Sequence, residues 1–256
     1  MDGVAFGSNP GQWPLPPATT THELWLRAVA AGGQGRYGCA LADLDRLRRL
    51  AGHGSLASLA FSARASFLRQ LGWHDRARSL DGLALTLADG HAIPAADALI
   101  GLAADALGVG RCAVSARALQ RAAELVPESA SGRLPVRLAW VAAELAMVSG
   151  DGAAAVANAE RAVRLCGSLA SVRHAVKSRV VLAAARCSNG EIEASRREAD
   201  EALRQTALFG LLPLRWAAAS LLAGIGSEEH SHTEVVAIRD GSAETVIRRG
   251  GVWRPQ

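Results

Sequence analysis

Aromatic residues make up only 4% of this chain, although half of its residues are hydrophobic. Many of the hydrophobic residues are alanine, which has the highest helix propensity and lets helices approach closely. A core assembled from large interlocking side chains would need more Leu, Ile and Phe. The composition therefore predicts an all-α fold of closely stacked helices.

Lysine is nearly absent as well, because Lys177 is the only one and arginine supplies the remaining basic residues. The net charge is +4, no run of five or more basic residues occurs, and Arg alternates with Glu and Asp. This pattern is typical of solvated helix faces. We therefore expect no direct contact with nucleic acid.

The four cysteines indicate neither a metal site nor a redox motif. No two are spaced as CxxC, and none has a histidine at metal-site spacing. We expect buried free thiols in a reducing compartment. His230 and His232, with Glu228 and Glu229 nearby, lack a third convergent ligand, so we expect an exposed polar cap there and no metal.

Motifs of enzymes and of membrane segments are also missing. The chain contains no GxSxG, GxxxxGK or HExxH motif and no strand-linked GxGxxG. Its N-terminus lacks the regions of a signal peptide. The most apolar stretch, Leu211 to Ile225, spans about 15 residues, contains Arg215 and is too short to cross a bilayer. These absences predict a cytoplasmic protein that is not an enzyme, has no cofactor and does not enter a membrane.

The chain does contain a repeated pattern around six glycines. They recur at intervals of 37, 38, 40, 40 and 36 residues. Each has a small residue seven positions before it, another small residue five positions after it and an apolar residue twelve positions after it. Self-similarity at this period is the signature of an array of helical hairpins. The glycines are Gly35, Gly72, Gly110, Gly150, Gly190 and Gly226.

The small residues have a geometric reason. In the third unit, Ala103 precedes the turn at Gly110 and Ser115 follows it. Two antiparallel helices touch at such positions, and a large side chain would push them apart. We predict helix, tight turn and helix in each unit, with Pro127 ending the second helix of the third.

This pattern resembles the tetratricopeptide repeat family over about residues 21–240. The matching features are the small residue before the turn, the turn glycine, the small residue after it and the apolar residue beyond, and Pro127 stands where that family often has a closing proline. The spacing exceeds the usual 34 residues, and Ala and Leu replace most of the family's large aromatic landmarks. The resemblance implies a right-handed α-solenoid of about six helical hairpins that binds other molecules.

The chain divides into three segments. Residues 1–20 are rich in Pro, Gly and Thr and predict a flexible arm, which either stays free or folds back into the groove of the array. Residues 21–240 form the repeat domain. Residues 241–256 are expected to form a C-terminal capping segment, with a short helix followed by a loose tail.

The sixth unit allows two interpretations. Its second helix would run from Ser227 to Arg239, with Val235 and Ile238 facing inward and a separate capping helix from Ala243 to Arg249. The apolar runs on either side of Asp240-Gly241 would also suit a β-hairpin. The match in register with the other five units favours the helix.

The first helix of each hairpin is expected to line a concave groove. Trp25, Trp140 and Trp216 share one register, ten residues before a turn glycine. Trp and Arg dominate binding hot spots, which favours a binding groove, although Trp residues also fill space between hairpins. We expect Trp140 and Met147 to act as apolar anchors and the basic residues to bind acidic groups. The predicted partner-binding residues are Trp25, Arg69, Arg137, Trp140, Glu144, Met147, Lys177 and Trp216.

The first hypothesis for function is a scaffold or adaptor that binds a protein or peptide in this groove. The alternative is a regulatory or sensor module of bacterial transcription control, which acts through a bound partner or a signalling peptide. The bare ends of the array would also suit a homodimer. An enzyme would need a strongly perturbed titratable pair in the groove.

Overall fold

The computed structural model describes residues 1–126 and 132–255, and all regular structure in these residues is α-helical. Pro127, expected to end a helix, lies outside the described residues. Within these described residues, twelve helices follow a short N-terminal one. The helices are α1 (Asp2–Ala5), α2 (Thr21–Gly33), α3 (Tyr37–Leu50), α4 (Ser55–Gln70), α5 (His74–Leu87), α6 (Ala92–Gly108), α7 (Cys112–Leu125), α8 (Arg133–Val148), α9 (Gly152–Cys166), α10 (Val172–Ser188), α11 (Ile192–Leu208), α12 (Leu212–Ile225) and α13 (His232–Arg248).

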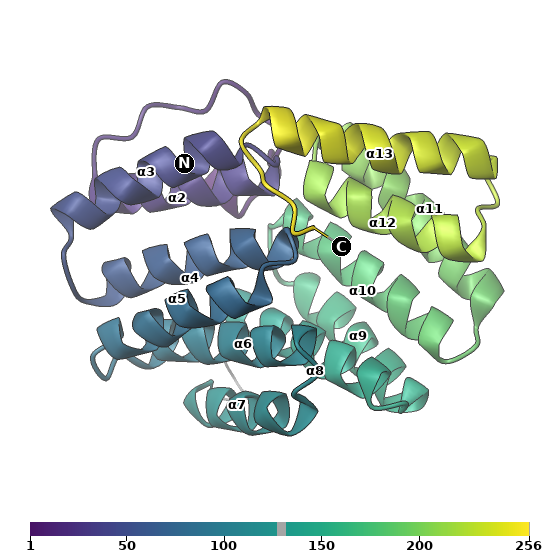
Figure 1. Ribbon diagram of the computed structural model, residues 1–256, viewed down its shortest axis with the longest axis horizontal. Helices are drawn as coiled ribbons and strands as arrows, with labels where there is room; N and C mark the ends of the chain where they lie inside the picture. Colours follow the sequence, from purple (N-terminus) through teal and green to yellow (C-terminus); the bar gives the residue numbers. More distant parts are fainter. Residues whose placement is uncertain (127–131, 256) are drawn as a thin grey trace.

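Consecutive helices pair as hairpins, from α2 with α3 to α12 with α13. Successive hairpins also pack on one another, for example through α5 with α6 and α9 with α10. Figure 1 shows the resulting array curving around, so that the C-terminal end of α13 comes to lie next to the turn between α2 and α3. The all-α prediction and the pairwise packing of helices are confirmed.

A tight turn joins the two helices in each of the first five hairpins. At Gly150, the glycine N–H donates to the Met147 carbonyl at 3.1 Å and the next N–H, of Asp151, donates to the Ala146 carbonyl at 2.9 Å. This pair of bonds satisfies the free carbonyls at the helix end and needs a left-handed residue, and Gly150 has φ 77°. The turns at Gly35, Gly72, Gly110 and Gly190 have the same hydrogen bonds.

The small residues lie where the helices of a hairpin touch. In the first five units, the residue seven positions before the turn glycine and those five and twelve positions after it all have no exposed surface. In the fifth unit, the Ser195 hydroxyl donates to the Ala183 carbonyl at 2.7 Å and joins α10 to α11 directly. The geometric reason given for small residues is thus confirmed in five units.

The sixth unit differs from the prediction. Residues 232–248 form one continuous helix, α13, so the β-hairpin alternative and a separate capping helix are both wrong. The helix begins four residues later than in the other units, because Ser231 is its N-cap and accepts a hydrogen bond from the Glu234 N–H. Val235 is buried as expected, whereas Ile238 is only partly buried, and Ser242 and Val246 complete the inward face.

The N-terminal segment is packed against the array, which corrects the prediction of a flexible arm. Val4 and Ala5 are buried in the same apolar cluster as α2. Removing these apolar side chains from water stabilises the packed position of the segment. The Gln34 amide donates to the Pro10 carbonyl at 2.8 Å, and the Val172 N–H donates to the Gly7 carbonyl at 3.1 Å. The segment therefore joins the first hairpin to the start of α10.

The C-terminal tail is likewise packed and not loose. The Arg254 N–H donates to the Leu71 carbonyl at 2.9 Å, and the Trp73 indole N–H donates to the Val252 carbonyl at 2.7 Å. The Trp253 ring lies 4.7 Å from that of Trp216. The tail thus runs from α13 across to α4 and α5, as Figure 1 shows.

The most apolar stretch forms α12, with Arg215 on it. No helix within residues 1–126 and 132–255 combines the length and apolarity needed to cross a membrane.

Candidate functional site

A cavity of about 430 Å³ lies on the concave side of the array. Its walls come from the first helices of all six hairpins, α2, α4, α6, α8, α10 and α12, together with Phe6 from the N-terminal segment. A second hollow of about 480 Å³ adjoins it and shares seven of its side chains, reaching past them to His74 and Leu107. The structure therefore provides a concave space of the size that small ligands or short peptide segments occupy.

All eight residues predicted to bind a partner lie in the walls of this cavity. They were placed by counting back from the turn glycines, and the structure shows why this works. Because each turn fixes where its helix ends, residues ten and thirteen positions before the glycine lie one helical turn apart on the same face. Five of the six residues at each of these positions line the cavity.

The tryptophans line the cavity and also pack against neighbouring elements of the array. Trp140 is only 5% exposed, its indole N–H donates to the Ser178 hydroxyl at 2.8 Å, and its ring stacks on His174 at 5.3 Å. Trp25 is also buried, with its ring 5.5 Å from Phe6. Trp216 is half-buried and contacts the C-terminal tail. The two interpretations of these residues, groove wall and filler between hairpins, therefore apply together.

Arg69 is paired with two carboxylates and does not stand free. Its Nε lies 2.7 Å from Asp105 Oδ1, and its Nη2 contacts Asp81. Burial, together with the neighbouring Asp105 charge, raises the pKa of Asp81 to about 7. Both carboxylates are buried, so removing Arg69 would leave them without a cation. Arg69, which was expected to bind an acidic residue of a partner, therefore pairs with carboxylates of its own chain.

Arg137 is also paired, with Asp97, which it shares with Arg133. Arg133 Nη2 lies 2.6 Å from Asp97 Oδ2, and its guanidinium carbon lies 5.6 Å from the Trp25 ring centre. Burial lowers the pKa of Arg133 and of Arg137 to about 10. Two guanidinium groups thus meet a single carboxylate at this side of the cavity.

Arg173 and Lys177 have no ion pair with any residue in the described part of the chain. Arg173 donates to the Ala5 carbonyl at 3.5 Å through Nη2, and its buried Nε has no hydrogen-bond partner among those residues. Lys177 Nζ lies 4.4 Å from the Trp140 ring centre. Burial lowers the pKa of both groups, and for Arg173, where the nearby Arg133 charge adds to the effect, the pKa falls to about 10.

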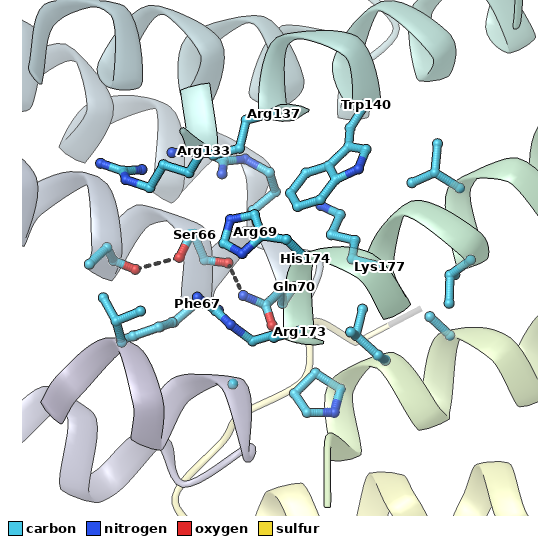
Figure 2. Close-up of a pocket in the computed structure, with 18 of the residues that line it drawn as sticks. Ser66, Phe67, Arg69, Gln70, Arg133, Arg137, Trp140, Arg173, His174 and Lys177 are labelled. Atoms are coloured by element: carbon cyan, nitrogen blue, oxygen red, sulfur yellow. Dashed lines mark hydrogen bonds between the residues drawn. The ribbon is translucent and has the colours of Figure 1, made fainter. Parts of the chain in front are cut away.

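His174 lies between these cations and stays neutral. Burial, followed by the charges of the neighbouring Arg and Lys side chains, lowers its pKa well below 6.5. Its Nδ1 lies 2.8 Å from the Ser171 hydroxyl. Figure 2 shows the basic side chains of α8 and α10 gathered with His174 and Trp140 around the same space.

Sequence reasoning missed Arg133, Arg173, His174 and Phe6. A signal for the two arginines exists, because each lies seventeen residues before a turn glycine and one helical turn before a residue, Arg137 or Lys177, that was placed in the groove. No comparable signal marks Phe6, which comes from a segment without periodicity.

Across the described ranges, no group of three or more His, Cys, Asp or Glu residues is arranged to hold a metal ion. Ser231, between His230 and His232, serves as the N-cap of α13. A comparison with protein-family models finds no match, and a comparison with curated protein sequences finds none either.

Proposed function

We propose that this protein is a binding module whose concave cavity holds a peptide segment of a partner protein. The observation that carries the proposal is the convergence of all six first helices on one cavity with aromatic, basic and apolar walls. Ligand sites are typically apolar concave spaces with a few placed polar groups, and Trp and Arg are the residues that dominate binding energy. We further propose that the hairpins form a right-handed superhelix of the tetratricopeptide type.

A regulatory or sensor role is the second candidate, and the packed termini favour it. Phe6 lines the cavity and belongs to the N-terminal segment, while Trp216 lines it and contacts Trp253 of the C-terminal tail. A bound ligand would therefore touch the N-terminal segment directly and the C-terminal tail only through Trp216. Such a ligand would stabilise the closed form and raise the melting temperature. A homodimer through the ends of the array stays a prediction.

The test needs a variant that blocks the cavity without dismantling its wall. Trp140→Ala is unsuitable, because truncating so buried a Trp costs about 3–5 kcal/mol of stability. Ala184 is half-buried on α10 and lines the cavity, so Ala184→Trp places a large ring inside it. Ala175, exposed on the same helix, gives the matched control Ala175→Trp.

The experiment captures partners from the native cell extract with wild type, Ala184→Trp and Ala175→Trp, and identifies them by mass spectrometry. Circular dichroism checks that all three are folded. We expect a partner that wild type and Ala175→Trp recover and Ala184→Trp does not. Equal recovery by all three would place the binding surface outside the cavity.

A further inference from the structure

Positive charge exceeds negative charge around the cavity. Five cationic side chains line it: Arg69, Arg133, Arg137, Arg173 and Lys177. Four carboxylates stand in or directly behind the same wall: Asp81, Asp97, Asp105 and Glu144. The five cations and four carboxylates leave an excess of one positive charge around the cavity.

Among the described residues, the cavity cations that have no ion pair lie on one face of α10. Arg173 and Lys177 lie four residues apart, so their side chains are neighbours on one face of the helix. Arg69 has Asp81 and Asp105, and Asp97 contacts both arginines of α8, whereas Arg173 Nε is buried without a partner in the described chain. Glu144 favours the charged form of Lys177 but forms no ion pair with it within the described residues.

The surroundings of these two cations are largely apolar. Lys177 faces the Trp140 ring, and the Arg173 guanidinium carbon lies 5.8 Å from the Phe6 ring centre. Aromatic faces partly offset a buried positive charge, but less than an anion does. At low local dielectric, an anion between the two cations would be held strongly, while a second anionic group on the same ligand would find no unpaired cation.

We propose that the cavity binds a ligand with an apolar or aromatic body and a single negative charge, and that Arg173 and Lys177 hold the charged group. This inference rests on the proposed function, since it assigns a chemistry to the same cavity. The apolar body lies against Trp140, Met147 and Trp216. The charged group is either that of a free organic acid or the terminal carboxylate of a peptide.

The test compares two fluorescent probes of nearly the same shape, anilinonaphthalene sulfonate, which carries one negative charge, and N-phenylnaphthylamine, which carries none. Each is titrated into full-length wild type, Arg173→Met, Lys177→Met and the exposed control Arg121→Met on α7. We expect wild type and Arg121→Met to bind the sulfonate about tenfold more tightly than the neutral probe. We expect Arg173→Met and Lys177→Met to lose about that factor for the sulfonate and to keep their affinity for the neutral probe.

Ala184→Trp identifies the site, and it should abolish binding of both probes. If the two probes bind wild type equally and the Met variants change neither, the charge assignment is overturned while the cavity survives as an apolar binding site. If neither probe binds, or Ala184→Trp has no effect on binding, both the inference and the proposed function fail for this cavity.

A competition experiment separates the two sources of the charged group. A short apolar peptide with a free C-terminal carboxylate, and the same peptide with an amidated terminus, are added to the complex with the sulfonate probe. Displacement by the free peptide alone supports a peptide end as the ligand. Failure of both peptides to displace a tightly held sulfonate supports a free organic acid.

Discussion

Replacing Ala143 with leucine tests whether the small residues keep the helices of a hairpin together. Ala143 has no exposed surface and belongs to the same apolar cluster as Ala155 and Ala159 of α9. If empty space existed at this contact, the extra carbons of leucine would stabilise the protein by about 2 kcal/mol, at about 0.8 kcal/mol per buried methylene. Because alanines face it across the contact, the larger side chain must instead push α8 away from α9.

Overpacking of this kind costs about 1–3 kcal/mol. In a chain of this size, each kcal/mol lowers the melting temperature by about 2–4 °C. We therefore expect Ala143→Leu to lower the melting temperature by about 2–12 °C and to shift the urea midpoint in the same direction. Ala157, exposed on α9, provides the control Ala157→Leu, which should change stability by less than about 0.5 kcal/mol. Unchanged or increased stability in Ala143→Leu would refute the close contact between α8 and α9.

Three further predictions concern the turns, the buried histidine and the tail. Gly150→Ala should cost about 1–2 kcal/mol in urea unfolding, because φ is 77° there, whereas Gly241→Ala within α13, with open space around the new Cβ, should stabilise by about 0.4–1 kcal/mol. Because the pKa of His174 is lowered in the folded state, only the unfolded chain binds a proton at this residue just below about pH 6.5. Stability should therefore fall as the pH drops below that value. His174→Gln should remove this part of the pH dependence in unfolding curves. Trp253→Ala should lower the unfolding free energy by at least about 0.5–1.5 kcal/mol, since it removes the ring contact with Trp216; no change in thermal unfolding would show that the tail does not hold the array closed.

The hairpins and the cavity wall could be predicted because they depend on local geometry. A glycine in the left-handed conformation fixes the end of one helix and the start of the next, and the helical period then fixes which side chains face inward. For this reason, counting back from Gly150 and Gly190 placed Trp140 and Lys177 in one cavity although they lie on different hairpins.

The error in the sixth unit has the same origin. Its loop places the start of α13 four residues later than expected. Four residues are close to one helical turn, so the apolar pattern looks almost unchanged after the shift. Ser231 and Ile238 stand five and twelve residues after Gly226 and have the residue types that the repeat requires. The buried positions are occupied by Val235 and Ser242, four residues further along.

The remaining features depend on contacts between residues far apart in the chain. The pairing of Arg69 with Asp81 and Asp105 requires α5 and α6 to lie against α4, which no local pattern reveals. The same holds for the termini, because the burial of Val4 and the bond from Arg254 to Leu71 exist only when the array curves far enough for its ends to approach. Such curvature is a sum over all hairpins and cannot be deduced from one repeat.

The most direct test of the cavity as the binding site is photocrosslinking in the native cell. A photoreactive phenylalanine analogue replaces either Met147, which lines the cavity, or Ala157, which is exposed on the second helix of the same hairpin. The proposed function predicts a light-dependent adduct from position 147 and none from position 157. Adducts from position 157 alone, or equally from both positions, would contradict binding in the concave cavity.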